Sequence, residues 1–392
     1  MAKLSITICG CGNGAHACAA MISSKGHDVN IYSPIQEEID RFIEAGDYKL
    51  NAILPDKSEI TTELNIITSD ASEVIPDSSI IFIIVPAFAH ENVLRNISKY
   101  ITENSLIVTI PTRSGFEFEA TNILPKCNII GLQTLPWACR IEEFGKKVNI
   151  IGRKIEIQVG SLPATISSVL LYEIEKLLDI KFSIVKSMLT LTLGNVGQII
   201  HPGIMYGIFG ENSDIKFEEN DIPLFYQSVD ENIAKILKTM SNEIQDTTNK
   251  LYENNNEVVD PSEVLTIDEW ILQSYGDQIQ DKSSLAKMFS TNSAYQGLKV
   301  PVKKVEGDLY APDFRTRYVL EDIPYGLLII KSIAQIVDVK TPQIDKVINT
   351  LGNLVGENYM ALLESVNRIA KISRLPMLYG IRTMKDMEKI YL

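Results

Sequence analysis

Apolar segments of two kinds alternate along the first 187 residues of the chain. Short continuous apolar runs are typical of strands that are buried on both faces of a parallel sheet, and the segments between them are long enough to form helices. The strand-like segments are 4–9, 28–32, 64–68, 80–85, 106–110, 126–132, 147–151 and 182–186, and the helix-like ones are 14–25, 36–45, 91–100 and 166–178. An edge hairpin is expected before 64–68. This alternation predicts an α/β fold with a doubly wound parallel sheet.

The pattern changes near residue 187, beyond which apolar residues recur at spacings of three and four. In the segment 224–253, residues such as Ile233 and Leu237 define one face of a long amphipathic helix. The other helix-like segments are 187–200, 323–337, 343–355 and 360–372. Since no strand pattern of comparable quality follows, we expect an α/β domain over residues 1–187 and an all-α domain over residues 188–392.

The charge balance narrows the classes of partner. The 392 residues include 37 Lys and Arg against 50 Asp and Glu, which gives a formal net charge of −13. A chain this acidic is a poor candidate for binding nucleic acid or an anionic membrane through bulk charge. Its longest apolar run, residues 80–89, is about half as long as the roughly 20 residues that a membrane-spanning helix needs. We therefore expect small-molecule partners, and neither nucleic acid nor membrane.

The five cysteines indicate a reducing compartment. Their number is odd, and the crowding of Cys9, Cys11 and Cys18 near the N-terminus does not resemble a disulfide framework. These three also lack the paired spacing of a zinc site, so we expect small-residue packing and no metal. No apolar signal core precedes the first predicted strand. These features predict a cytoplasmic protein.

A glycine-rich segment lies between the first predicted strand and the first predicted helix. It reads Gly10-Cys11-Gly12-Asn13-Gly14-Ala15 and matches the pattern G-x-G-x-x-A. The first glycine permits a tight turn, the second lets the backbone approach a pyrophosphate, and the small last residue lets the helix pack on the strand. We expect a Rossmann domain whose dinucleotide contacts include Gly10, Gly12, Asn13, Gly14 and Ala15. The alternative is a tight turn without a ligand.

Two further parts of this domain bear on the cofactor. The second predicted strand ends at Tyr32-Ser33-Pro34, where an acid would favour NAD by binding the adenine ribose. Because Ser33 stands there instead, the sequence favours NADP, although no cation is in evidence for a 2′-phosphate. Pro86 and Ala87 follow the strand 80–85 and either line the nicotinamide side or simply end the strand. His16, after the glycine-rich segment, contacts the ligand or bonds to the helix N-terminus.

Candidate chemistry in the second domain centres on one histidine. His201 follows the apolar segment 192–200 and precedes Pro202-Gly203, which we expect to end that helix. A helix C-terminus stabilises a histidine cation, which suits a general acid and base, whereas the alternative is a capping contact with the backbone. Arg317 could clamp a carboxylate and Asp322 could orient a histidine. The alternative for these two is a surface arginine and a helix cap.

The chain resembles the opine dehydrogenase family, of the octopine/nopaline dehydrogenase type. The resemblance rests on four stretches in the family's order, Gly10-Cys11-Gly12-Asn13-Gly14-Ala15-His16-Ala17, Thr134-Leu135-Pro136-Trp137-Ala138-Cys139-Arg140, Asn195-Val196-Gly197-Gln198-Ile199-Ile200-His201-Pro202 and Arg317-Tyr318-Val319-Leu320-Glu321-Asp322. It implies a Rossmann domain followed by a helical opine dehydrogenase domain, like that of 6-phosphogluconate dehydrogenases. It also implies NAD(P)H-dependent condensation of an α-keto acid, usually pyruvate, with an amino acid through an imine.

The resemblance assigns roles to single residues. It implies that His201 is the acid and base, that Asp322 is its partner and that Arg317 holds a substrate carboxylate. Asn195 is implied to be a second polar contact of the substrate. Family members include monomers and dimers, so the chain is expected to be either a monomer or a homodimer.

One departure from the family's pattern concerns the amine donor. Gln133 precedes the stretch that begins at Thr134, where members that select arginine carry a Glu for the guanidinium. A neutral Gln cannot form that ion pair, which argues against arginine as the donor. Trp137 either packs beside a substrate side chain or is buried in the core.

Two other protein classes share part of this pattern. Hydroxy-acid dehydrogenases of the glycerol-phosphate or ketopantoate type have the same domain order but use a Lys as the general acid. No Lys lies between Lys186 and His201, which argues against them. A Rossmann redox sensor would keep the glycine-rich segment, but would not need His201, Arg317 and Asp322 to lie together.

Overall fold

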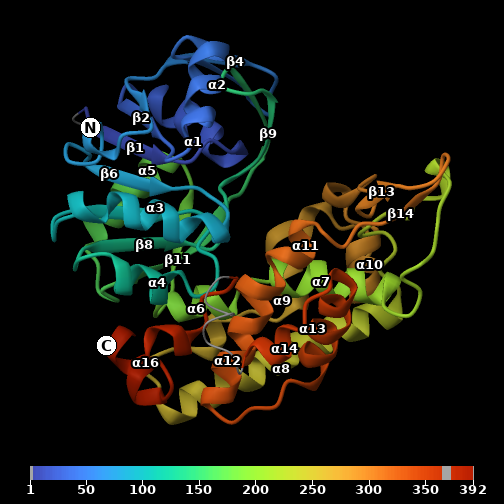
Figure 1. The fold of residues 1–392 in the computed structure, drawn as a ribbon. Helices are drawn as coiled ribbons and strands as arrows, with labels where there is room; N and C mark the ends of the chain where they lie inside the picture. Colours follow the sequence, from blue (N-terminus) through green and yellow to red (C-terminus); the bar gives the residue numbers. More distant parts are fainter. Residues whose placement is uncertain (1–2, 364–371, 392) are drawn as a thin grey trace. The chain divides into compact units, whose positions relative to one another are not determined.

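The computed structural model describes residues 3–363 and 372–391, which fall into two compact units (Figure 1). The first unit takes residues 1–191 together with residues 389–392, and the second takes residues 192–388. The helix α6 (Met188–Leu193) contains the change from one unit to the other.

Within the described residues, the first unit contains an eight-stranded sheet in the order β12-β11-β8-β7-β6-β1-β2-β5. Its strands are β1 (Ser5–Cys9), β2 (Asp28–Tyr32), β5 (Ile67–Thr68), β6 (Ile80–Ile83), β7 (Leu106–Thr109), β8 (Asn128–Leu132), β11 (Glu156–Leu162) and β12 (Lys181–Ile184). Neighbouring strands are parallel except for β11, which runs antiparallel to β8. Every residue of β6 and β7 is buried, which explains their uninterrupted apolar sequences.

Helices pack against this sheet and contribute buried side chains to the core (Figure 1). They are α1 (Asn13–Ser23), α2 (Gln36–Gly46), α3 (His90–Ile97), α4 (Phe116–Ile123) and α5 (Ser168–Leu178). The small side chains of α1, among them Ala15, Ala17 and Ala19, are fully buried, because a helix of small residues can approach the strands closely. The sequence did not predict α4, in which buried Glu117 and Glu119 interrupt the apolar pattern.

A second sheet in the first unit has the order β4-β3-β10-β9. Its strands are β3 (Lys49–Ile53), β4 (Glu59–Glu63), β9 (Trp137–Glu143) and β10 (Lys147–Arg153). The sequence predicted the segment 147–151 and an edge hairpin before residue 64, which β3 and β4 form. It did not predict β9, which is polar and mostly exposed on one face. The sheet is mixed, since β10 is parallel to β3 and antiparallel to β9.

The second unit is built almost wholly of helices (Figure 1). They are α7 (Gly197–Phe209), α8 (Glu231–Asn254), α9 (Ile267–Tyr275), α10 (Leu285–Ser290), α11 (Arg317–Leu320), α12 (Leu328–Ile336), α13 (Pro342–Val355), α14 (Tyr359–Leu362) and most of α16 (Met384–Tyr391). One small antiparallel pair, β13 (Val302–Lys304) and β14 (Tyr310–Pro312), was not predicted. Most of the helix expected at 360–372 lies outside the described residues.

The helix that carries His201 differs from the prediction. The segment 187–200 is not one helix, because a turn at 194–196 separates α6 from α7. Pro202 does not end the helix but lies inside α7, which continues to Phe209. The missing proline N–H costs one backbone hydrogen bond, and the buried apolar side chains around it, such as Ile199 and Met205, offset that cost. His201 is therefore not at a helix C-terminus, and the dipole argument for its charge does not apply.

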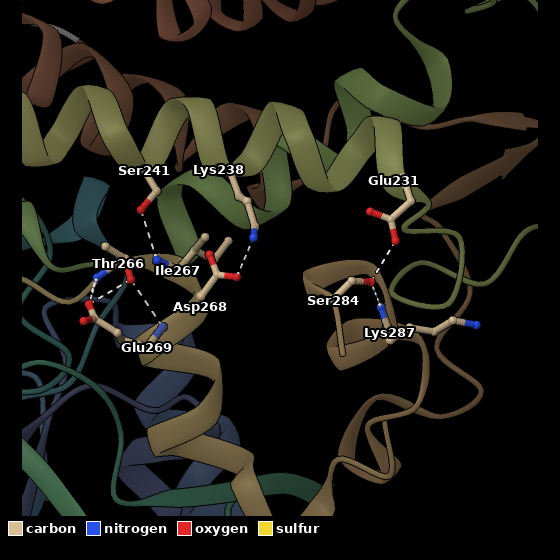
Figure 2. Close-up of polar contacts among 9 residues, drawn as sticks. All are labelled: Glu231, Lys238, Ser241, Thr266, Ile267, Asp268, Glu269, Ser284 and Lys287. Carbon is tan, nitrogen blue, oxygen red and sulfur yellow. Dashed lines mark hydrogen bonds and ion pairs between the residues drawn. The ribbon is translucent and has the colours of Figure 1, made fainter. Parts of the chain in front are cut away.

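Polar contacts join α8 to the starts of α9 and α10 (Figure 2). The hydroxyl of Ser241 accepts the backbone N–H of Ile267 at 3.0 Å, and Lys238 forms an ion pair with Asp268 at 2.9 Å. Thr266 and Glu269 form a reciprocal capping box at the start of α9. These contacts attach α9, with its aromatic residues, to the long helix α8.

None of the helices among the described residues is both long and apolar enough to cross a lipid bilayer.

Candidate functional site

The first residue of the glycine-rich loop, Gly10, lies too close to neighbouring backbone to carry a side chain. Gly10 has a φ of +127°, and a Cβ there would lie 2.4 Å from the carbonyl oxygen of Ile84. The loops after β1 and β6 therefore lie against each other at the carboxyl ends of neighbouring strands, where the strand order of the sheet reverses. Open α/β sheets bind ligands at this position.

The next positions of the loop fit a phosphate group. No described atom lies within 4 Å of the place that a Cβ on Gly12 would take, so the backbone is open there. Gly12 caps α1, and no side chain in the described chain accepts from the first-turn N–H groups. A Cβ on Gly14 would lie 2.6 Å from Leu135 Cδ2, so glycine permits close packing there. Open N–H groups at a helix start are the donors that a pyrophosphate needs.

Asn13 and Ala15 attach this loop to the rest of the first unit. The side-chain oxygen of Asn13 accepts the backbone N–H of Ile141 at 2.7 Å, which ties the loop to β9. Ala15 is fully buried in the core of the first unit. The backbones of the predicted loop residues are thus placed for a dinucleotide, whereas the Asn13 side chain has a structural partner.

His16 supports the loop and faces the core. Its Nε2 accepts the backbone N–H of Gly145 at 2.8 Å, so its Nδ1 carries the proton and donates to the Gly12 carbonyl at 3.0 Å. Burial lowers the pKa of His16 to about 4. Of the two predictions for this residue, the hydrogen bond at the helix start is confirmed.

The structure brings a carboxylate to the end of β2 that the linear sequence did not indicate. Ser33 is buried, and its hydroxyl donates to Oε2 of Glu38 in α2 at 2.6 Å. Burial raises the pKa of the Cys11 thiol, and the nearby Glu38 carboxylate raises it further. Glu38 therefore lies beside both the glycine-rich loop and Ser33, although Ser33 itself is not an acid.

Pro86 and Ala87 follow β6 at the same edge of the sheet. A Cβ on Gly10 would lie 2.9 Å from Val85 Cγ1, so this segment is adjacent to the glycine-rich loop. Pro86 precedes a short helical turn, and Ala87 is buried. Their position fits a contact with the cofactor, and the nicotinamide role remains a prediction.

Gln133 and Trp137 flank the second stretch of the resemblance. Gln133 follows β8, and its amide donates to the side-chain oxygen of Gln158 at 2.9 Å. Trp137 begins β9, is 3% exposed and belongs to the core cluster of the first unit. That burial agrees with the core alternative for Trp137. Lys154 also supports this stretch, because its Nζ donates to the Thr134 hydroxyl at 2.8 Å.

In the second unit, the predicted acid–base pair is formed. Nδ1 of His201 lies 2.9 Å from Oδ2 of Asp322, whose side chain is only 4% exposed. A carboxylate can only accept, so Nδ1 carries the proton and Nε2 is the nitrogen left for other partners. The His201 side chain is 22% exposed, and Nε2 is the ring nitrogen that Asp322 does not bind.

The approach of Asp322 to His201 depends on a glycine. Asp322 precedes a five-residue π-helical turn, Ile323–Leu327, that continues into α12. A Cβ on Gly326 in this turn would lie 2.7 Å from the Cβ of Gln198 in α7. Glycine thus lets the turn pack closely on α7 at Gln198, which precedes His201 by three residues.

Aromatic rings surround the imidazole, and the sequence did not point to them. Tyr318 stacks on His201 with ring centroids 4.2 Å apart and planes 14° apart. Phe225 lies 6.1 Å away, and the Tyr226 hydroxyl is 3.5 Å from His201 Nε2. Tyr318 lies within one of the four stretches that carry the resemblance, so the sequence could have pointed to it. Phe225 and Tyr226 lie in none of these stretches.

Arg317 and Asn195 lie on the elements that frame the pair. Arg317 begins α11, next to Tyr318, and its Nε bonds to Glu321 Oε2. Its side chain is exposed, and within the described ranges its remaining guanidinium nitrogens form no ion pair. Asn195 is buried in the turn before α7, where its carbonyl accepts from the N–H of Gln198.

The two units thus hold two different kinds of site. The first unit offers backbone donors that fit a dinucleotide phosphate, and the second offers an imidazole whose Nε2 can take or give a proton beside an exposed arginine.

Two family models match the chain. One is described as NAD/NADP octopine/nopaline dehydrogenase, alpha-helical domain, and matches residues 184–355. The other is described as NAD-dependent glycerol-3-phosphate dehydrogenase N-terminus and matches residues 5–126. The first match includes His201 and Asp322, and the second includes the glycine-rich loop.

Similarity to individual proteins extends over nearly the whole chain. The octopine dehydrogenase of Pecten maximus is 32% identical over 401 residues, covering 97% of this chain and 98% of the relative. The opine dehydrogenase of Haliotis discus hannai is 33% identical over 412 residues, covering 99% of both. A solved structure of octopine dehydrogenase with NADH and pyruvate has a TM-score of 0.88 at 31% identity, over 98% of both chains.

Proposed function

This chain belongs to the opine dehydrogenase family and is an NAD(P)-dependent oxidoreductase that acts on CH–NH bonds, and we propose that it joins pyruvate to the amino group of an amino acid. The octopine dehydrogenase structure with NADH and pyruvate supports pyruvate as the keto acid. The product is a secondary amine that carries two carboxylates.

The observation that carries this proposal is the His201–Asp322 pair beside Arg317. Asp322 accepts from Nδ1–H, which leaves Nε2 to take a proton from the ammonium group of the amino acid and to give it to the departing hydroxyl when the carbinolamine of the two substrates loses water. The exposed guanidinium of Arg317 binds a substrate carboxylate and offsets the acidic field of the chain. When bound at the glycine-rich loop, NAD(P)H supplies the hydride that reduces the imine.

The same pair argues against the two other classes. A redox sensor has no use for an oriented imidazole, and His201, Tyr318 and Asp322 are in contact here. A hydroxy-acid dehydrogenase of the glycerol-phosphate type would carry a lysine where this chain has His201.

The cofactor that we propose is NAD rather than NADP. The expectation of NADP rested on the lack of an acid after β2, and Glu38 brings a carboxylate to that strand end through Ser33. A carboxylate there accepts from the 2′-hydroxyl of the adenine ribose and repels a 2′-phosphate.

This choice is testable at Glu38. In Glu38→Gln the repulsion is gone, so we expect the ratio of kcat/KM for NADH to that for NADPH to fall about tenfold. The matched control is Glu37→Gln, because Glu37 is adjacent in α2 but exposed. An unchanged ratio in Glu38→Gln, or an equal change in both variants, would contradict the assignment.

The amine donor that we propose has a neutral side chain. Gln133 pairs with the amide of Gln158, and this pair provides no carboxylate for a guanidinium. Asn195, Gln133 and Trp137 remain proposed substrate contacts on the basis of the resemblance, and the burial of Trp137 makes it the weakest of the three.

The deciding experiment is the oxidation of NADH and of NADPH at 340 nm with pyruvate and pooled amino acids. Controls contain pyruvate alone and amino acids alone. Turnover that needs both substrates supports imine reduction, and dividing the pool then identifies the amine. Turnover with pyruvate alone would instead mean a hydroxy-acid dehydrogenase, and no turnover in any combination would contradict the choice of pyruvate.

We also propose a cytoplasmic location. All five cysteines lie in the described range as free thiols, and four of them are buried. Such thiols are typical of proteins in a reducing compartment.

A further inference from the structure

The hydroxyl of Tyr226 lies next to Nε2 of His201, the ring nitrogen that takes part in proton transfer. His201 is occupied on the other sides, because Asp322 binds Nδ1 and Tyr318 covers one ring face. Nε2 points along the remaining edge, where the Tyr226 oxygen lies 3.5 Å away. That separation is longer than a good O–H···N hydrogen bond, so the two groups approach one place without satisfying each other.

Tyr226 is held rigidly in this position. Its ring stacks on Tyr295 with centroids 3.9 Å apart and planes at 15°, and Phe225 packs edge-on against it at 4.9 Å. A ring held on both sides cannot swing its hydroxyl away from His201. Burial raises the pKa of Tyr226, so the hydroxyl keeps its proton and acts only as a hydrogen-bond partner.

We propose that the Tyr226 hydroxyl is a further catalytic group, which binds the oxygen that leaves as water when the imine forms. An oxygen atom placed about 2.8 Å from both Tyr226 Oη and His201 Nε2 completes a triangle with their 3.5 Å separation. This inference rests on the proposed reductive condensation.

The step balances with the groups present. Nε2 of His201 first takes a proton from the ammonium group of the amino acid, which frees the amine to add to the keto carbon. The C–O bond of the resulting carbinolamine then breaks, its oxygen takes this proton from Nε2 and departs as water, and the nitrogen lone pair forms the C=N bond. Tyr226 donates a hydrogen bond to the departing oxygen and loses no proton. It therefore lowers the barrier for water loss, and it has no part in the later transfer to the imine carbon.

The test separates these two steps in Tyr226→Phe. Forward turnover is measured with NADH, pyruvate and the amino acid that the wild-type enzyme accepts, and it includes water loss. The reverse reaction is measured in a stopped-flow instrument as first-turnover NADH formation from NAD⁺ and the purified wild-type product, and it precedes any hydration of the imine. We expect forward kcat to fall at least tenfold, while the first-turnover rate constant stays within about twofold of wild type.

The matched control is Tyr295→Phe, which removes a hydroxyl from the adjacent ring of the same stack. Both rates should stay at the wild-type values in this variant. The inference is overturned if Tyr226→Phe leaves forward kcat unchanged, or slows the first turnover as much as the forward reaction. Failure of the proposed function is visible separately, as wild-type enzyme without turnover that needs both substrates.

Discussion

Two histidines of this chain have opposite surroundings, and these decide what each can do. His16 is fully buried and has a partner on both ring nitrogens. His201 has a carboxylate on Nδ1, a side chain that is 22% exposed, and the Tyr226 hydroxyl 3.5 Å from Nε2. A buried imidazole with hydrogen bonds to both nitrogens serves the fold, whereas a partly exposed one with a carboxylate on Nδ1 alone can exchange protons with a substrate.

His16 should make the protein sensitive to acid. Its pKa is about 4 in the folded chain and about 6.5 in the unfolded chain, so between these values the unfolded chain binds more protons and stability falls with falling pH. We expect His16 to contribute about 2 kcal/mol less to the free energy of unfolding at pH 5 than at pH 7.5.

Urea unfolding at both pH values, compared with that of His16→Gln, measures this difference. The variant should be less stable than wild type at pH 7.5, and its stability should depend less on pH. An equal dependence on pH in the two proteins would contradict the burial of a neutral His16.

Replacing His201 should abolish chemistry and spare the cofactor. Because Nε2 is the ring nitrogen that the pair with Asp322 leaves for proton transfer, His201→Ala should lower kcat by about 10²–10⁴-fold. The affinity for NADH, measured by fluorescence titration, should stay within about twofold, since the glycine-rich loop is part of the other unit. A variant that keeps its turnover would remove His201 from the mechanism.

At the scale of elements, α8 supplies a hydrogen-bond acceptor for a backbone N–H at the start of α9, where no acceptor exists within α9 itself. The N–H of Ile267 at the start of α9 has its partner on α8, in the hydroxyl of Ser241 (Figure 2). Both residues are buried, so water cannot replace this bond. The ion pair of Lys238 with Asp268 connects the same two helices but is largely exposed.

These two contacts should differ in strength. Ser241→Ala leaves a buried N–H without a partner and should cost about 1–3 kcal/mol of stability. Lys238→Ala, one turn away on the same helix, should cost less than about 1 kcal/mol. Denaturant unfolding followed by Trp270 fluorescence measures both, and equal losses would show that the hydroxyl is not the determining contact.

The order of elements was largely predictable, and the exceptions have physical causes. The parallel strands β6 and β7 were predicted because burial on both faces makes their sequences almost wholly apolar. The strands β1 and β2 were predicted although each contains a buried polar residue, Thr7 and Asn30 respectively. In the second sheet, the hairpin of β3 and β4 was expected before residue 64, whereas β9 was missed because its exposed face is polar. The predicted end of the helix at Pro202 was wrong, because α7 continues to Phe209. The packing of buried side chains offsets the hydrogen bond that the proline lacks, and no local pattern reveals this packing.

At the scale of the whole molecule, the last residues of the chain belong to the unit that begins it. Tyr391 is buried, and its hydroxyl donates to Oε1 of Glu117 in α4 at 2.8 Å. Residues 389–392 therefore complete the first unit, although nearly all of the preceding chain from residue 192 belongs to the second. The first unit depends on a segment that is distant in sequence.

Removing this hydroxyl should destabilise the first unit. Tyr391→Phe should cost about 1–3 kcal/mol, because it deletes a buried hydrogen bond to a carboxylate. The chain has two tryptophans, of which Trp137 lies in the first unit, so urea unfolding in a Trp270→Phe background reports on that unit. Tyr252→Phe, on the exposed part of α8, is the control and should leave the transition unchanged.

The sequence by itself determined the class of fold and the residues of the glycine-rich loop, because both depend on local spacing. It also identified His201, Asp322 and Arg317 through short stretches that resemble the family. Only the tertiary structure decided which groups surround them. Glu38 reaches Ser33 from the following helix, and Tyr226 reaches His201 from outside every recognisable stretch. Such contacts join segments that only folding brings together, so no local pattern encodes them.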